Sequence, residues 1–261
     1  MPYALITGAS RGIGRAIATE LARCGYSLLL AARSEDQLEQ LATELRQRHG
    51  IAAHVYAADL AAPGAAGKLA YWAMAQTSEL AVLVNNAGYG LWGRFEELPL
   101  DQQQNMLQLN MLLPTELTHM LLPQLRRQPK AYILNVASTA AYQAVPTLTL
   151  YAASKAFLLS FSRGLRYELR DTNVSVTCLS PGSTTTDFAD RAGMNAQLQE
   201  TANKVSMTPQ KVAQQAVAAL LTGEAELIPG TLNKVSAHLT SFVPKALTEK
   251  IAAGIYEKHL K

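Results

Sequence analysis

The chain has 261 residues, of which 49% are hydrophobic and 16% charged, enough apolar material for one large core and too much for a disordered chain. The formal net charge of +3 comes from residues 231–261, where five lysines face two glutamates, so residues 1–230 are neutral. A neutral body argues against nucleic-acid binding, which needs a basic face.

Cysteine and histidine usage also narrows the possibilities. Cys24 and Cys178 stand far apart in apolar surroundings, which predicts two buried thiols in a reducing compartment. The five histidines show no metal-ligand spacing, so no metal site is predicted. The first strand begins at Tyr3, which leaves no room for a signal peptide, and the most apolar helical stretch, 106–125, has too many polar residues for a membrane span. We expect a cytoplasmic protein.

Short apolar runs rich in β-formers alternate with longer segments of helical period. The expected strands are residues 4–7, 28–32, 54–57, 81–84, 132–136 and 174–179. This alternation predicts an α/β fold: a Rossmann-type, doubly wound parallel sheet with helices on both faces, in one domain over residues 1–230. Ligands of such sheets bind beyond the carboxyl ends of the strands.

Local signals mark two helix starts and one loop. Ser34 with Gln37 forms a capping-box pattern, and Thr208 before Pro209 places a cap residue ahead of a first-turn proline. Residues 181–207 are rich in small polar residues with weak periodicity, which predicts a mobile substrate lid.

A glycine-rich turn follows the first strand and precedes a helical run at residues 15–23. Such a turn lets backbone approach a pyrophosphate, which the helix N-terminus stabilises through free N–H groups. The spacing is Gly-x-x-x-Gly-x-Gly rather than the general dinucleotide pattern. The candidate cofactor-binding residues of this turn are Gly8, Ser10, Arg11, Gly12, Ile13 and Gly14.

The residues after the second strand bear on the choice of cofactor. A site for NADH would place an acid there to accept from the ribose 2′-hydroxyl, whereas this chain has Arg33. Arg33 and Arg11 can offer guanidinium groups to a 2′-phosphate, which favours NADP(H). The alternative is that both arginines are solvated loop charges.

Two further turns lie at the same expected edge. Asp59, followed by Leu60, can accept from an adenine amino group or simply cap the next helix. Asn86, Ala87 and Gly88 form a tight polar turn after the fourth strand, whose small residues suit a flat cofactor lying against backbone.

The catalytic candidates begin with a tyrosine and a lysine on one helical face. Only Tyr151 among ten tyrosines has a lysine four residues on, Lys155, whose ammonium would favour the phenolate. Ser138, just after the fifth strand, can hold a substrate oxygen while Tyr151 transfers the proton. Asn110, a polar residue in an apolar helical stretch, is either a proton-relay member or a satisfied buried amide.

The order and spacing of TGASRGIG, NNAG, Asn110, Ser138 and Tyr151-x-x-x-Lys155 resemble the short-chain dehydrogenase/reductase family over roughly residues 3–230. The resemblance implies a catalytic tetrad of Asn110, Ser138, Tyr151 and Lys155, with Lys155 also binding the nicotinamide ribose. It implies that Pro181, Gly182, Thr184 and Thr186 contact the nicotinamide end. It also implies a homodimer or homotetramer, and residues 84–125 with the tail resemble a bacterial DltE-type branch.

The C-terminal segment, residues 231–261, carries apolar residues at near-helical spacing and predicts an amphipathic helical extension. Docking on the body or on a second subunit is favoured over contact with an anionic membrane. The stripe comprises Val235, Leu239, Phe242, Val243, Leu247, Ile251 and Ile255. An apolar substrate pocket is expected from Tyr89, Leu91, Trp92, Tyr142 and Val145.

The expected activity is NADPH-dependent reduction of a small-molecule carbonyl, either a ketone or aldehyde or a 3-oxoacyl group, with Tyr151 as general acid/base. The alternative is a catalytically silent NADP-binding sensor. A sensor has no physical need for a lysine beside the tyrosine, so the intact tetrad favours the enzyme.

Overall fold

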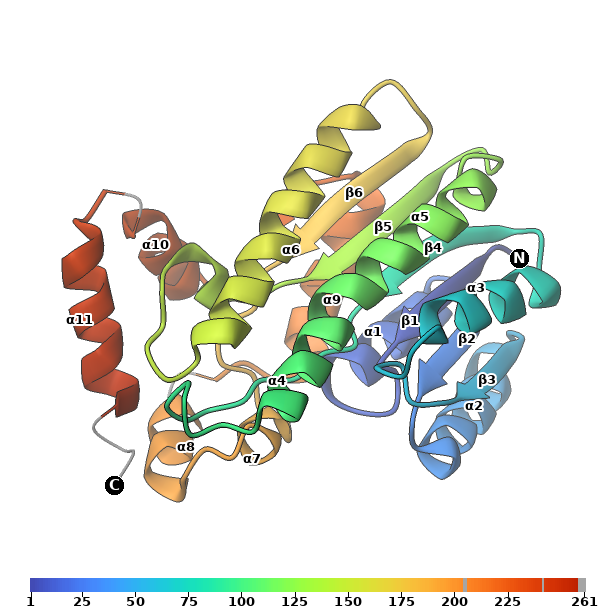
Figure 1. The fold of residues 1–261 in the computed structure, drawn as a ribbon. Helices are drawn as coiled ribbons and strands as arrows, with labels where there is room; N and C mark the ends of the chain where they lie inside the picture. Colours follow the sequence, from blue (N-terminus) through green and yellow to red (C-terminus); the bar gives the residue numbers. More distant parts are fainter. Residues whose placement is uncertain (204–205, 241, 258–261) are drawn as a thin grey trace.

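Seven parallel strands form one sheet in the order β3-β2-β1-β4-β5-β6-β7 (Figure 1). The computed structural model describes residues 1–203, 206–240 and 242–257, with only the backbone at 201–203. The strands are β1 (Tyr3–Thr7), β2 (Ser27–Ala32), β3 (Ala53–Ala57), β4 (Leu80–Asn85), β5 (Ala131–Val136), β6 (Val174–Leu179) and β7 (Glu226–Leu227). The predicted fold class and six predicted strands are confirmed. The two-residue β7 was not predicted, because so short a segment shows no periodicity.

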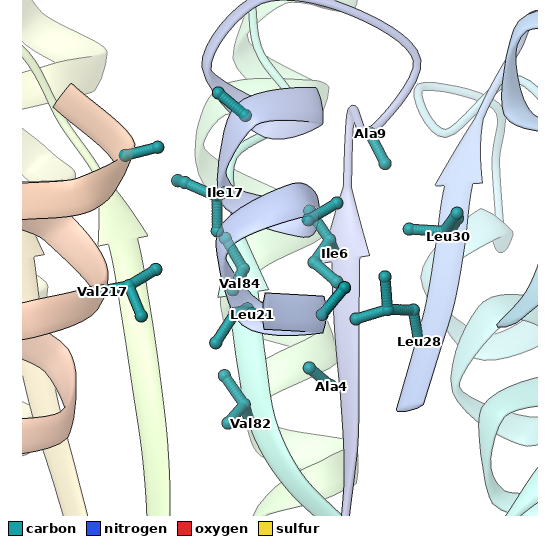
Figure 2. Close-up of a cluster of buried hydrophobic side chains, with 14 of the residues drawn as sticks. Ala4, Ile6, Ala9, Ile17, Leu21, Leu28, Leu30, Val82, Val84 and Val217 are labelled. Atoms are coloured by element: carbon teal, nitrogen blue, oxygen red, sulfur yellow. The ribbon is translucent and has the colours of Figure 1, made fainter. Parts of the chain in front are cut away.

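Helices cover both faces of the sheet. On one face lie α1 (Gly12–Arg23), α2 (Glu35–His49) and α9 (Pro209–Thr222), and on the other lie α3 (Ala65–Gln76), α5 (Leu113–Leu125) and α6 (Thr149–Glu168). Figure 2 shows Ile17 and Leu21 of α1 and Val217 of α9 packed near Ile6 and Val84 of the sheet. Because both faces are covered, the sheet can bury every side chain of its central strands.

The burial of successive strand residues explains the continuous apolar runs. Ile6 contributes to the core under α1, whereas its neighbour Leu5 contributes to the core on the opposite face, and both are fully buried. In the same way, Leu28 contributes to the core under α1 and Leu29 to the core on the opposite face. Successive side chains of a strand point to opposite faces, so a sheet covered on both sides favours apolar residues at successive positions and not only at alternate ones.

The remaining elements gather near the carboxyl ends of the strands or follow α9. They are α4 (Leu100–Leu107), the π-helix η1 (Gln108–Leu112), the 3₁₀-helix η2 (Thr139–Tyr142), α7 (Phe188–Arg191), α8 (Ala196–Asn203), α10 (Thr231–Leu239) and α11 (Lys245–Tyr256). The predicted lid is therefore partly helical. No helix in the described ranges is long and apolar enough to cross a membrane.

Several local predictions can be compared with the structure. Thr208 caps α9, accepting from the backbone N–H of Lys211 at 3.4 Å, as predicted. Ser34 holds the N-cap position of α2 but its side chain makes no capping bond, so the capping box is wrong. Cys178 is buried, but Cys24 is exposed beyond the end of α1, so its predicted burial is wrong.

The tail packs differently from the prediction. Its small residues Ala237 and Ala252 and the polar Thr248 are buried, whereas the predicted apolar stripe is mostly exposed. Leu239 and Ile251, for example, are 53% and 56% exposed. Docking of that stripe on the body is therefore wrong, and its docking on a second subunit stays a prediction. Positions 241 and 258–261 of the predicted extension lie outside the described residues.

Candidate active site

The loops that leave the carboxyl ends of β1 and β4 are joined by hydrogen bonds through Thr7. Its hydroxyl accepts from the backbone N–H groups of Asn86 and Ala87, both at 3.0 Å, and donates to the Val84 carbonyl at 3.2 Å. Asn86 Nδ2 donates to the Thr7 carbonyl at 2.8 Å. The glycine-rich loop and the 86–88 turn thus form one rigid floor at the point where the strand order reverses.

Two glycines of the first loop have a geometric reason to be glycine. A Cβ on Gly14 would lie 2.2 Å from the Gly8 carbonyl oxygen and 2.4 Å from Asn86 Nδ2. Gly12 has φ +54°, in the left-handed region, where larger residues are strained. Helix α1 begins there with no side-chain cap and no acid in its first turn. Its N–H groups therefore remain available for an anion.

The other predicted cofactor residues have different surroundings. Arg33 and Asp59 are exposed where β2 and β3 end, and Asp59 Oδ1 accepts from the Ala61 N–H at 3.1 Å, as a turn cap. Leu60 is 3% exposed and packs in the core beneath α3, so its side chain is directed into the core. In the first loop Ser10 is buried, and Ile13 packs against the core under α1.

The segment after β6 crosses back over the glycine-rich loop. Pro181 accepts from the Thr139 N–H at 3.0 Å, and Thr184 Oγ1 donates to the Gly182 carbonyl at 3.1 Å. The Cγ2 atom of Thr186 lies 3.1 Å from the Cβ position of Gly12. The structure therefore places the 181–186 segment beside the glycine-rich loop.

Ser138, Tyr151 and Lys155 lie together at the carboxyl end of β5. Tyr151 and Lys155 lie on one face of α6, with Lys155 Nζ 5.8 Å from the centre of the tyrosine ring. Lys155 is 5% exposed and donates to the Val136 carbonyl at 2.9 Å. Ser138 accepts from the Ala140 N–H at 3.1 Å, and its hydroxyl is near enough to Tyr151 to act on the pKa of the tyrosine. The three side chains therefore converge on one point.

Burial dominates the ionisation of this group. It raises the pKa of Tyr151 to about 12, against a smaller opposing effect of the hydrogen bond with Ser138. Burial also lowers the pKa of Lys155 to about 8. The expected bias of Tyr151 towards phenolate is therefore wrong for the free protein. Desolvation keeps the Tyr151 hydroxyl protonated at neutral pH, so the tyrosine can act as a proton donor.

Asn110 lies in the π-turn η1 and is 1% exposed. Its Nδ2 donates to the Tyr89 carbonyl and to Ser154 Oγ, both at 3.0 Å, and its Oδ1 accepts from the Tyr89 N–H at 3.2 Å. The amide is thus satisfied and fixes the loop after β4 against α6. Its role in a proton relay stays a prediction.

An apolar cluster surrounds Tyr151. It contains four of the five predicted pocket residues: Tyr89, Leu91, Trp92 and Val145. Its members that were not predicted from the sequence include two aromatic residues: Phe188 of α7, whose ring centre is 5.2 Å from that of Tyr151, and Tyr256 of α11. Neither residue belongs to a recognisable motif, and only the folding of the lid and tail over α6 brings them here.

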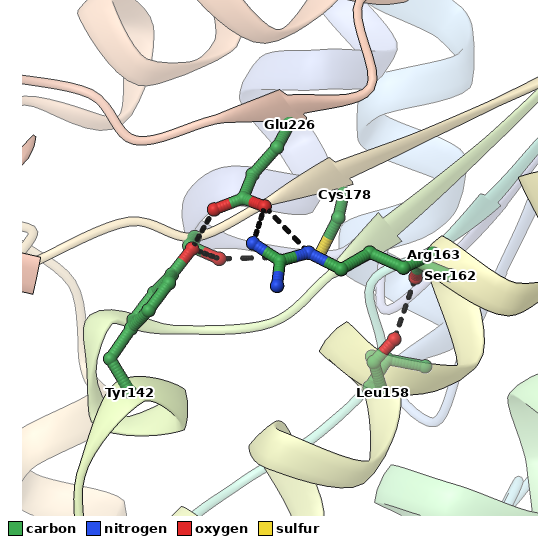
Figure 3. A network of polar contacts seen from close by, with 7 residues as sticks. Tyr142, Leu158, Ser162, Arg163, Cys178 and Glu226 are labelled. Atoms are coloured by element: carbon green, nitrogen blue, oxygen red, sulfur yellow. Dashed lines mark hydrogen bonds and ion pairs between the residues drawn. The ribbon is translucent and has the colours of Figure 1, made fainter. Parts of the chain in front are cut away.

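The fifth predicted pocket residue, Tyr142, has a structural role instead. Its hydroxyl donates to Glu226 of β7 and to Ser180 Oγ, and Arg163 Nε of α6 donates to the same carboxylate at 3.0 Å (Figure 3). Burial and the hydrogen bond with Glu226 raise the pKa of Tyr142. This network ties the edge strand β7 to α6 and to the loop after β5.

The donor set fits a dinucleotide cofactor. The close approach at Gly14 leaves backbone exposed beside a free helix N-terminus, which suits a pyrophosphate. Arg33, exposed at the end of β2, suits an anionic group on the adenosine ribose. The hydroxyl of Tyr151 and the ammonium of Lys155 lie beyond the other end of this floor, where a reacting carbonyl would be held.

Comparisons with known proteins agree with this arrangement. A family model described as short chain dehydrogenase matches residues 2–197. A very-long-chain 3-oxoacyl-CoA reductase of Anas platyrhynchos is 36% identical over 185 residues, 69% of this chain and 58% of that protein, so the chain covers less than two thirds of that relative's length. The ketoacyl reductase HetN of a Nostoc strain is 30% identical over 241 residues, 92% of this chain and 82% of that protein.

A solved structure also matches over nearly the whole fold. It is a short-chain dehydrogenase from Sphingobium yanoikuyae in complex with NADPH, 28% identical, with a TM-score of 0.81. The match covers 94% of this chain and 97% of that one.

Proposed function

The chain belongs to the short-chain dehydrogenase/reductase family, and on that premise we propose that it is an NADPH-dependent reductase converting a carbonyl to an alcohol. The observation that carries the proposal is the convergence of Ser138, Tyr151 and Lys155 beside the glycine-rich floor. The chemistry that NADPH supplies when bound is transfer of a hydride to the carbonyl carbon.

The protein's own residues supply the proton that the reduction needs and orient the carbonyl oxygen that receives it. Ser138 donates a hydrogen bond to the carbonyl oxygen and orients it towards Tyr151. The Tyr151 hydroxyl, protonated at neutral pH, donates its proton to that oxygen as negative charge develops there. The ammonium of Lys155 stabilises the phenolate that remains, and burial strengthens this attraction by lowering the local dielectric constant.

The preference for NADPH over NADH is supported by Arg33. It follows β2, where an acid would repel a 2′-phosphate, and it is exposed towards solvent. The solved relative from Sphingobium yanoikuyae carries NADPH.

The substrate is proposed to be apolar around its carbonyl. The residues packed against Tyr151 are mainly apolar, and α7 and α11 contribute two aromatic rings to them. The names of two relatives, a very-long-chain 3-oxoacyl-CoA reductase and a ketoacyl reductase, make 3-oxoacyl groups the first compounds to assay. Placement in the DltE-type branch, based on residues 84–125 and the tail, is part of the same proposal.

The test combines binding with turnover. Fluorescence titrations with NADPH and NADH are followed by NADPH oxidation against ketones, aldehydes and 3-oxoacyl thioesters. We expect tighter binding of NADPH and turnover of at least one carbonyl class. Tyr151→Phe should lower turnover by about a hundredfold or more while NADPH binding stays near its original value. Normal turnover by this variant would overturn the mechanism, and tight binding without any turnover would favour the sensor.

A further inference from the structure

The short helix α7 is tethered to the glycine-rich loop. Arg11 Nη1 of that loop lies 3.2 Å from Asp187 Oδ2, immediately before α7, and Thr186 packs against Gly12. Arg191, one helical turn beyond Asp187, is bonded to it through the backbone, its N–H donating to the Asp187 carbonyl at 3.1 Å. The tether therefore fixes the position of the Arg191 backbone relative to the glycine-rich loop.

The Arg191 guanidinium lies over the loop after β4. Its Cζ is 5.9 Å from the ring centre of Tyr89, which directly follows the 86–88 turn. Burial raises the pKa of Tyr89, and the charges of Arg33 and Arg191 both oppose that shift. Burial lowers the pKa of Arg191, as do the nearby charges of Arg33 and Arg11. Three guanidinium groups from three separate segments thus lie near enough to act on one another electrostatically, beside the glycine-rich loop and the 86–88 turn.

This cluster has more positive charge than its protein partners neutralise. Asp187 pairs with Arg11, but in the described part of the chain neither Arg33 nor Arg191 has a carboxylate within ion-pair distance. Like charges held together repel, and their repulsion is relieved when an anion binds between them. A phosphate dianion matches the two uncompensated charges, and guanidinium forks suit its oxygens.

We propose that Arg191 is a specificity-determining residue: with Arg33 and Arg11 it binds the 2′-phosphate of NADPH, so that the protein binds the phosphorylated cofactor preferentially. The inference rests on the proposed preference for NADPH. It goes beyond the glycine-rich loop and Arg33, because the third guanidinium comes from α7, in the segment after β6.

The experiment measures fragments of the cofactor rather than turnover. Calorimetric titration of the full chain with 2′,5′-ADP reports binding of an adenosine that carries the 2′-phosphate, and titration with 5′-ADP reports binding of an adenosine that carries the pyrophosphate and no 2′-phosphate. For Arg191→Gln we expect about tenfold weaker binding of 2′,5′-ADP and unchanged binding of 5′-ADP. Arg191→Lys keeps the charge but loses the planar guanidinium. Its affinity for 2′,5′-ADP should lie between those of the unsubstituted protein and Arg191→Gln.

A matched control is Arg94→Gln, because Arg94 is also exposed but pairs with Glu97 at 3.9 Å, outside the cluster. It should leave both affinities unchanged. Equal losses for both fragments in Arg191→Gln would show a contact with the pyrophosphate or a general effect on the lid, and would overturn the proposal, as would no loss at all. If the unsubstituted protein binds NADPH no better than NADH, the preference for NADPH itself fails, and the inference fails with it.

Discussion

Tyr151 and Lys155 illustrate how burial sets the chemistry of single residues. Both groups are buried, and in each case desolvation favours the neutral form, raising the pKa of the tyrosine and lowering that of the lysine. A neutral tyrosine is the form that a reduction needs, since it must give a proton away. The charged lysine is the form that stabilises the resulting phenolate, and it is available only below its lowered pKa.

The rate of carbonyl reduction should therefore fall at a lower pH than the ordinary pKa of a lysine would predict. Below about pH 8 Lys155 keeps its proton, and above it the ammonium is lost while Tyr151 stays protonated. We expect kcat/KM to be level on the acid side of this value and to fall as pH rises through it. A pH profile with saturating NADPH measures this, with circular dichroism to verify folding. A level profile up to about pH 10, near the ordinary lysine value, would contradict the prediction.

The π-turn η1 shows how an irregular element serves the site. A regular helix through residues 100–125 would repeat every 3.6 residues, whereas the wider turn at Gln108–Leu112 inserts Asn110 between the loop after β4 and α6. Three hydrogen bonds of its amide hold these two segments. The turn thus positions the 86–90 loop, over which the cofactor is proposed to lie.

Asn110→Leu should destabilise the protein by about 1–3 kcal/mol, because the Tyr89 N–H and C=O lose their partner inside the fold. It should also lower turnover through movement of the loop. Urea denaturation measures the free energy of unfolding. Ser154→Ala is the matched control, since it removes one of the three bonds and keeps those to Tyr89. Equal destabilisation by the two variants would show that the contacts with Tyr89 contribute little.

At the scale of the whole molecule, the C-terminal helices contribute to the surroundings of a site that lies at the carboxyl edge of the sheet. Ala252 of α11 is 1% exposed and packs in the cluster around Tyr151, as does Tyr256 one turn later. The main core, under α1, α2 and α9, contains no residue of α10 or α11. The tail therefore packs around Tyr151, whereas the core beneath α1, α2 and α9 is formed without α10 and α11.

Ala252→Glu should weaken carbonyl turnover and leave cofactor binding intact. A carboxylate at this buried position is costly and displaces α11 from the site. We expect kcat/KM for the carbonyl to fall about tenfold or more, with the Kd of NADPH within about twofold of its original value. Leu247→Glu, at a position 50% exposed on the same helix, should change neither. A parallel loss of NADPH affinity in Ala252→Glu would contradict the separation of the two ends.

The sequence by itself determined the fold class, six of the strands and the order of the site motifs. These features follow from local rules: a strand buried on both faces is mostly apolar, and a turn whose backbone packs closely on itself needs glycine, as Gly14 does against the Gly8 carbonyl. The spacing of Tyr151 and Lys155 on one helical face follows from helix geometry alone. None of these requires knowledge of distant segments.

Only the tertiary structure decided the environment of those residues. The direction of the Tyr151 pKa depends on how completely α7 and α11 bury it, and sequence spacing carries no measure of desolvation. The convergence of Arg191 with Arg33 and Arg11 joins segments more than a hundred residues apart. Electrostatic fields and burial sum over all neighbours in space, so they are determined when the lid and tail fold onto the sheet edge.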